Sequence, residues 1–168
     1  MDASDVAAIV AALAAVLATA FAGVEVRRST MERQDARAAE RNGVAVAWAP
    51  AIRPNHSDQD GRATWVYEIV VQNPGHLPVR DVRVTVVFGV EVRRLHYDGA
   101  LDEPSSTMHL TTPVVLGGGT RTWRRTVTLP FDDRDQLTST TASVSFTPAD
   151  SPRQTNYMDG RPPDLAPR

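Results

Sequence analysis

One long uncharged run near the N-terminus limits what this chain can fold into more than any other feature does. Residues 6–24 carry no charge, and Thr19 holds the run's one hydroxyl group. At about 1.5 Å per residue, a helix of this length reaches ~28 Å, close to the ~30 Å hydrocarbon core of a bilayer. Its larger apolar side chains lie on all sides of the helix, which is typical of a membrane span: Val6, Ile9, Val10, Leu13, Val16, Leu17, Phe21 and Val24.

Alanine makes this predicted transmembrane helix only moderately hydrophobic, because it fills nine of the nineteen positions. The eight larger apolar residues favour insertion by about 2.5–5 kcal/mol, which is sufficient. A buried helix of a soluble protein is one alternative. A cleavable signal peptide is another, although residues 1–5 carry Asp2 and Asp5 where such a peptide has basic residues.

Charged residues on the two sides of the span predict its orientation. No lysine or arginine precedes the span, whereas Arg27, Arg28, Arg33, Arg37 and Arg41 follow it. Because basic residues next to a span stay in the cytoplasm, we expect the N-terminus outside the cell membrane and the C-terminal domain on the cytoplasmic side. Arg27, Arg28 and Arg33 are then the membrane-surface residues, and the first two can reach lipid phosphates.

Small residues recur at every fourth position of the span and form one smooth helix face: Ala11, Ala15, Thr19 and Gly23. Such a face lets two helices approach closely, so it predicts a homodimer formed through the transmembrane helix. The alternative is that alanine is abundant in every register of this run. A charged helix is expected over residues 25–42, as a stalk that continues the span and stops at Asn42-Gly43.

From Gly43 the spacing of apolar residues changes from helical to alternating, which is typical of strands with one buried face. The expected strands lie within residues 44–48, 65–72, 82–88, 90–97, 107–116, 121–129 and 139–146. Turn-forming residues separate them, and Gly117-Gly118-Gly119 predicts the tip of a hairpin. About seven short strands in residues 43–147 predict an antiparallel β-sandwich, with a small barrel as the alternative.

The segment VVQNPGHLPVRDVRVTVVF (Val70 to Phe88) resembles the N-x-G/S-x-x-P-V-x-D-V-x-V strand–turn–strand of bacterial immunoglobulin-like domains. The whole layout resembles a class of small actinobacterial membrane proteins with one N-terminal helix, an arginine-rich linker and such a domain. Many of them end in F-T-D-x-x-G-x-x-W-x-R-x-x-x-G, a pattern that this chain follows loosely at Phe146, Thr147, Asp150, Tyr157, Gly160 and Arg161. The resemblance implies an immunoglobulin-like fold and a membrane location, but no activity.

Residues 148–168 contain five prolines and few apolar residues, so we expect a mobile tail. Residues 156–158 are the part of this tail that can add an edge strand.

Composition and motif spacing indicate no reaction. The chain has no cysteine, and all eighteen of its basic residues are arginine, which excludes thiol and lysine chemistry. Its formal net charge of −2 argues against nucleic-acid binding. Its histidines (His56, His76, His96 and His109) lack metal-ligand spacing. The acidic run Asp132, Asp133 and Asp135 lacks a calcium-loop pattern and predicts a loop or short helical turn.

Arg121 and Arg125 flank Trp123 on one face of a predicted strand. We expect both to stack on its ring, and an anionic partner is the alternative. The three tryptophans, Trp48, Trp65 and Trp123, are expected in the core because they lie on strand patterns.

These patterns together predict a single-pass, membrane-anchored protein that is not an enzyme and needs no cofactor, metal or small-molecule substrate. We expect it to present an interaction module at the lipid bilayer to a protein partner. An accessory subunit, held in a membrane complex through its transmembrane helix, is one alternative. A module that binds the cell envelope outside the cytoplasm is the other.

Overall fold

The computed structural model describes residues 31–159 and 164–165, and the chain divides into two compact units, Met1–Ala39 and Glu40–Arg168. The predicted span 6–24, its small-residue face, Arg27 and Arg28 lie outside the described residues. Within the described part of the chain, no helix combines the length and the apolar character that a membrane crossing requires. Residues 31–42 are helical, Arg33 is exposed there, and the helix ends at the expected Asn42-Gly43 stop.

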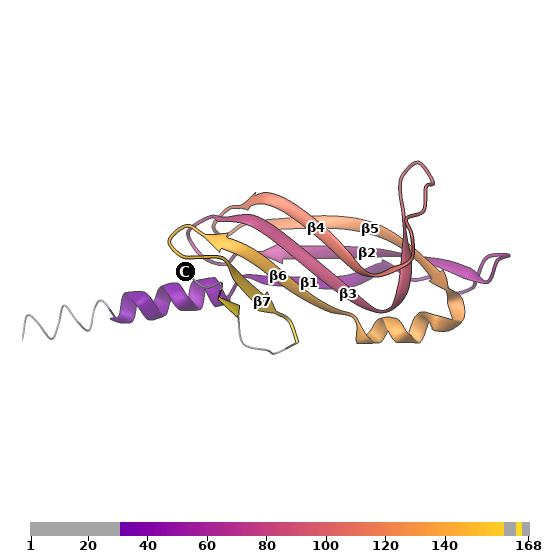
Figure 1. Ribbon diagram of the computed structural model, residues 1–168, viewed down its shortest axis with the longest axis horizontal. Coiled ribbons are helices and arrows are strands. Elements are labelled where there is room, and N and C mark those ends of the chain that lie inside the picture. The colour runs from indigo at the N-terminus through magenta and orange to yellow at the C-terminus, as the bar shows by residue number, and fades with distance from the viewer. Residues whose placement is uncertain (1–30, 160–163, 166–168) are drawn as a thin grey trace, which may run out of the picture. The chain divides into compact units, whose positions relative to one another are not determined.

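The second unit is mainly β, and all its strands pair in antiparallel fashion (Figure 1). The described strands are β1 (Ala45–Ile52), β2 (Arg62–Gln72), β3 (Val79–Leu95), β4 (Ser105–Val115), β5 (Thr120–Pro130), β6 (Thr141–Pro148), β7 (Gln154–Tyr157) and β8 (Asp164–Leu165). A 3₁₀ helix, η1 (Phe131–Ser139), links β5 to β6 and contains the acidic run. The prediction of a short helical turn there is confirmed.

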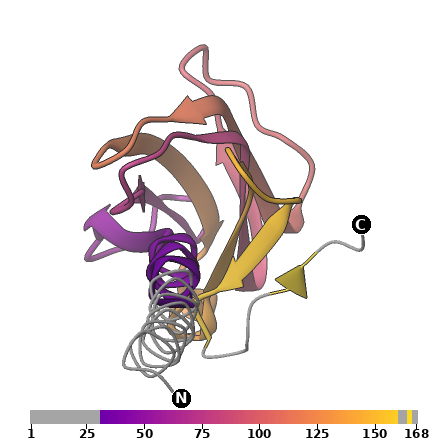
Figure 2. The same cartoon turned by 90° about the vertical axis from the view of Figure 1, so that its left-hand side faces the viewer.

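One strand, β3, belongs to both halves of the sheet. Its residues 79–92 pair with β4 and residues 79–87 pair with β6, whereas Arg93–Leu95 pair with Thr126–Thr128 of β5. The first half has the order β1-β2-β5, and the second has β4-β3-β6-β7-β8. Figure 2 shows that the sheet curls over, so that the two halves face each other across the interior as in a sandwich.

The prediction of two strands, 82–88 and 90–97, was wrong because Gly89 does not interrupt β3. The apolar alternation continues through it, from Phe88 to Val92. Glycine is required there for a different reason. A Cβ atom at Gly89 would lie 1.9 Å from Ser139 Oγ and 2.2 Å from the Gln136 carbonyl oxygen, so only glycine lets η1 lie directly on β3.

The core consists of the inward-facing residues of both halves. Val82, Val84 and Val86 of β3 are buried, as are Ile69 and Val71 of β2. Tyr67 and Phe88 meet edge to face, with ring centroids 5.6 Å apart. Each fully buried aliphatic side chain of this size stabilises the folded state by about 1.5–3 kcal/mol, so this interface holds the two halves together.

Asn73 connects the two turns at one end of the sandwich. Its buried Nδ2 donates to the carbonyl oxygens of Leu77 (2.9 Å), Leu116 (3.1 Å) and Val115 (3.3 Å). Its Oδ1 accepts from the Gly75 amide at 3.2 Å. One side chain thereby fixes both the β2–β3 turn and the β4–β5 turn.

The prediction of a hairpin at Gly117-Gly118-Gly119 was wrong, although the turn itself is present. The strands that this turn joins do not pair with each other, because β4 pairs with β3 and β5 pairs with β2 along its length. The Gly118 amide instead donates to the Gly75 carbonyl at 2.8 Å. A Cβ at Gly117 would lie 2.1 Å from the His76 carbonyl oxygen, so the two turns pack backbone against backbone.

The tail holds the point where the helix enters the sandwich. Residues 154–157 form β7 against β6, so the tail does add a strand. Asn156 Nδ2 donates to the carbonyl oxygens of Val44 (2.8 Å) and Arg41 (3.0 Å), and Gln154 Nε2 donates to Asn42 Oδ1 at 3.1 Å. These bonds tie β7 to the C-terminal end of the helix and to the residue before β1.

We predict that Asn73→Ala lowers the free energy of unfolding by about 2–3 kcal/mol, because it leaves buried carbonyl and amide groups without partners. Urea unfolding of the full chain, followed by tryptophan fluorescence, measures this loss. The exposed Asn55→Ala is the matched control and should change the value by less than about 0.5 kcal/mol. Equal effects of the two substitutions would contradict the role of Asn73.

Candidate functional site

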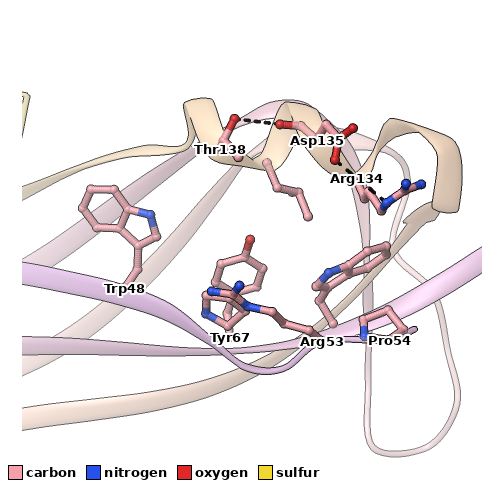
Figure 3. Close-up of a pocket in the computed structure, with 10 residues that line it drawn as sticks. Trp48, Arg53, Pro54, Tyr67, Arg134, Asp135 and Thr138 are labelled. Atoms are coloured by element: carbon pink, nitrogen blue, oxygen red, sulfur yellow. Dashed lines mark hydrogen bonds and ion pairs between the residues drawn. The ribbon is translucent and has the colours of Figure 1, made fainter. Parts of the chain in front are cut away.

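A cleft of about 360 Å³ lies between β1, β2 and η1 (Figure 3). Two tryptophans, a tyrosine and two prolines supply half of its lining residues: Trp48, Trp65, Tyr67, Pro50 and Pro54. Arg53, Arg134, Asp135, Leu137 and Thr138 complete it. The volume lies at the lower end of the range for ligand sites, and the lining is rich in aromatic surface, as is usual for such sites.

Strand alternation places the aromatic residues of the cleft on the inner face of the first half of the sheet. Trp48 of β1 is opposite Ile69 of β2, and Pro50 is opposite Tyr67. The register between β1 and β2 shifts after Pro50. Because proline cannot donate to the ladder, it is tolerated on an edge strand such as β1, which then bends away at the mouth of the cleft.

The 3₁₀ helix η1 forms the opposite wall of the cleft. Phe131 stacks on Trp65, with ring centroids 6.5 Å apart and planes inclined by 24°. The Arg134 guanidinium lies 4.4 Å from the centre of the Phe131 ring, and its Nη1 donates to the Phe131 carbonyl at 3.1 Å. Gly89 allows the other end of η1 to lie on β3. Both ends of this wall are therefore held by the sandwich.

Three polar groups on the aromatic side chains of the cleft have no hydrogen-bond partner among the described residues: the Tyr67 hydroxyl and the indole N–H groups of Trp48 and Trp65. None of them belongs to the fully buried polar atoms that lack a partner. A ligand in the cleft can therefore reach them. Figure 3 shows the Tyr67 hydroxyl pointing toward η1, across the space between Trp48 and Arg53.

The electrostatic environment of Tyr67 follows from this position. Burial raises the pKa of the Tyr67 phenol above its ordinary value of 10.0, and the charge of Arg53 partly offsets that rise. Tyr67 is thus a neutral hydrogen-bond donor at physiological pH. With Arg53 and Arg134, the cleft offers hydrogen-bond donors and aromatic faces to a ligand, and Asp135 adds one carboxylate.

The arginines that flank Trp123 differ from each other. The Arg121 guanidinium lies 5.6 Å from the centre of the Trp123 ring, so its predicted cation–π contact is confirmed. The same prediction for Arg125 was wrong. Its Nη1 donates to the Arg124 carbonyl at 2.9 Å, and its Nε is buried without a partner. Burial lowers the pKa of Arg125, and the charges of Arg94 and Arg121 lower it further.

The structure does not bring the histidines together. His96 Nε2 lies 2.7 Å from Asp102 Oδ1 in the β3–β4 loop, and His109 Nδ1 lies 3.2 Å from the Thr85 hydroxyl. His76 is near Glu40, at 3.9 Å. In the described ranges, no group of three or more histidine, aspartate or glutamate residues is arranged to hold a metal.

The cleft was not predicted from the sequence, although Trp48 and Trp65 were expected in the core. Trp65 and Trp123 are buried as expected, whereas Trp48 is only partly buried and lines the cleft. Pro50 and Pro54, which follow Trp48 closely, are the signal that β1 bends away at this point.

We predict that wild type loses stability more steeply than Tyr67→Phe as the pH rises through about 10 and beyond. The folded-state pKa of Tyr67 is raised, so its contribution is complete below the unfolded-state pKa and is lost as the pH rises through the folded-state pKa. Urea unfolding over this pH range tests the prediction. Parallel curves for the two proteins would contradict it.

Comparisons with known proteins assign no family. No family model matches the chain, and no curated protein does. Solved structures with similar regions include structural genomics target SoR45 (TM-score 0.38, 12% identity, 75% of this chain and 88% of that one). Another is the GH20 exo-β-N-acetylglucosaminidase from Vibrio harveyi (TM-score 0.40, 11% identity, 68% of this chain and 17% of that one). A third is the sporulation control protein Spo0M from Bacillus subtilis (TM-score 0.33, 11% identity, 73% of this chain and 47% of that one). Such low scores identify neither a family nor a function.

Proposed function

We propose that this chain is a non-enzymatic, single-pass membrane protein that presents an immunoglobulin-like module to a protein partner, on the cytoplasmic side. The aromatic cleft between β1, β2 and η1 is its binding site. The observation that carries the proposal is the set of three unpartnered donor groups on aromatic side chains, held between two walls that the core positions.

The strand order supports the immunoglobulin-like assignment. In the constant type of such sandwiches the first, second, fourth and fifth strands share one sheet and the third, sixth and seventh share the other, and the variable type adds edge strands to the second of these sheets. The strand β4 departs from the constant type, because it pairs with β3. Here β1, β2 and β5 form one half and β4, β3, β6 and β7 form the other. The membrane location rests on the uncharged run 6–24 and on the arginines that follow it.

The cleft suits an extended, proline-rich segment of the partner. Such a segment adopts a polyproline II conformation, whose carbonyl groups make no internal hydrogen bonds and whose rings pack on aromatic faces. The Tyr67 hydroxyl and the indole N–H groups of Trp48 and Trp65 can donate to those carbonyls. Asp135, whose side chain is 89% exposed, stands at the rim and can pair with a basic residue of the segment.

We predict that Trp48→Ala weakens binding of a synthetic proline-rich peptide by about tenfold or more, because aromatic anchors contribute most to such interfaces. Fluorescence anisotropy with the purified full chain measures the Kd. The matched control is Tyr97→Ala, since Tyr97 is fully exposed and outside the cleft. A peptide whose prolines are replaced by alanine should bind weakly to wild type and to Tyr97→Ala alike. Equal Kd values for wild type and Trp48→Ala would refute the cleft as the binding site.

Orientation can be tested with one engineered thiol, because the chain has no cysteine of its own. Tyr97 lies in the β3–β4 loop and is fully exposed, so Tyr97→Cys places a reactive group at the surface of the sandwich. We expect a membrane-impermeant maleimide to label it only after the cells are permeabilised. Labelling in intact cells would place the module outside the cytoplasm.

A further inference from the structure

The strand β4 forms a free edge of the second half of the sheet, because β3 is its one strand partner among the described residues. It is eleven residues long, SSTMHLTTPVV, and has no lysine, arginine, aspartate or glutamate. Proteins commonly protect such an edge with charged side chains. Here Pro113 is the one feature in β4 that discourages pairing, and it lies near the end of the strand.

The backbone groups on this edge can be identified from the hydrogen bonds of Thr107. The Thr107 amide does not take part in the β3 ladder. It donates instead to the Ser105 hydroxyl, at 3.0 Å. Antiparallel ladders alternate, so the amide and carbonyl groups of His109 and Thr111 point to the same free side. Both residues are exposed. Residues 109–111 therefore present a short unpaired edge to solvent, whereas the Ser105 hydroxyl occupies both backbone groups of Thr107.

The strand β5 forms the other side of the same opening. Residues 120–125 pair only with β2, because β3 joins β5 at Thr126–Thr128. Residues 116–119 connect β4 to β5 at one end of the opening, and β3 closes the other end by pairing with Ser105 and with Thr126–Thr128. The two free edges thus flank one gap in the curled sheet.

Three arginines line the inner side of this gap. Arg121 and Arg125 lie opposite the buried Val71 and Tyr67 of β2, and Arg94 lies opposite the buried Val127, so all three are on the core-facing side. None of the three has a carboxylate within ion-pair distance among the described residues. Arg125 Nε is buried without a partner, and Arg94 and Arg121 are close enough to lower the pKa of Arg125.

We propose that the β4 edge binds an acidic, extended segment of a partner protein by strand addition. The added strand continues the second half of the sheet and pairs with the backbone of His109 and Thr111. Alternate side chains of this strand then point inward, where Arg121 and Arg125 lie. Glutamate or aspartate at these positions supplies the carboxylates that the two guanidinium groups lack.

Nearby acidic residues set the register of the added strand. Arg94 lines a pocket of about 120 Å³ together with Asp102, Glu103 and Met108. Negative charge is therefore already present near the Ser105 end of β4. The acidic side chains of the partner belong at the other end, beside Arg121 and Arg125, and an uncharged side chain suits the pocket next to Met108.

A synthetic peptide in which glutamate alternates with valine and threonine tests this surface on the purified full chain. We expect Arg121→Gln/Arg125→Gln to weaken its Kd by about tenfold or more. The matched control is Arg124→Gln, because Arg124 lies on the same strand, opposite Glu68 on the outer face, and is exposed. This control should change the Kd by less than about twofold. A peptide with glutamine in place of glutamate should bind the wild-type protein weakly. Its Kd should match that of the glutamate peptide for the double variant.

Strand addition is tested separately with Thr111→Pro, which removes one free-edge amide, and Thr111→Val, which keeps it. We expect only the proline variant to lose peptide binding, and peptide to protect the amides of His109 and Thr111 from hydrogen exchange. Equal binding by the two variants, or protection confined to β1, would overturn the proposal. So would concentration-dependent protection of the β4 edge without peptide, which would identify a second copy as the occupant. Trp48→Ala should leave this binding unchanged, which separates the β4 edge from the cleft.

Discussion

The fold depends on the continuity of β3. This strand is seventeen residues long and pairs with β4, β6 and β5 in turn, so it connects both halves of the sheet without a loop. Because it passes from one half to the other, the sheet must curl, and the inner faces of both halves come together as one core. Gly89 lies within this strand and admits η1. Gly89 thus continues β3 and also allows η1, the wall of the cleft, to pack directly on this strand.

Two openings follow from this arrangement, and they differ in chemistry. The cleft beside η1 presents aromatic rings, a phenol and indole N–H groups, and Arg53, Arg134 and Asp135 add charge to its lining. The gap between β4 and β5 presents backbone groups on one side and guanidinium groups on the other. An aromatic surface with few charges recognises shape and ring stacking, whereas unpaired guanidinium groups recognise carboxylates. The module therefore has two surfaces that differ in what they add to arginine: aromatic rings in the cleft, and an unpaired strand edge beside β5.

The alternation of apolar and polar residues predicted where most strands lie, because it reflects which side chains are buried. It did not predict which strands pair. Gly89 suggested a break, and Gly117-Gly118-Gly119 suggested a hairpin, since glycine has the same local signature in a turn and at a close contact. In both places the reason for glycine is a backbone or side chain distant in the sequence.

The candidate sites were beyond sequence reasoning for the same physical reason. Trp48 and Trp65 were expected in the core, yet the cleft that they line exists only because η1 lies opposite them. Arg125 was paired with the nearest ring in the sequence, whereas burial and two neighbouring arginines decide its environment. Asn73 was recognised as a turn residue, but its partners Val115 and Leu116 lie 42 and 43 residues away.

The attachment of the tail to residues 41–44 has a mechanical consequence. Any pull on the chain N-terminal to the sandwich arrives first at Arg41, Asn42 and Val44, whose carbonyl groups Asn156 holds from β7. Since β1 belongs to one half of the sheet and β7 to the other, the load is divided between the two halves. The first strand is therefore not peeled away alone. Because Val44 and Asn156 are 112 residues apart, this resistance to force exists only once the strands between them have been synthesised.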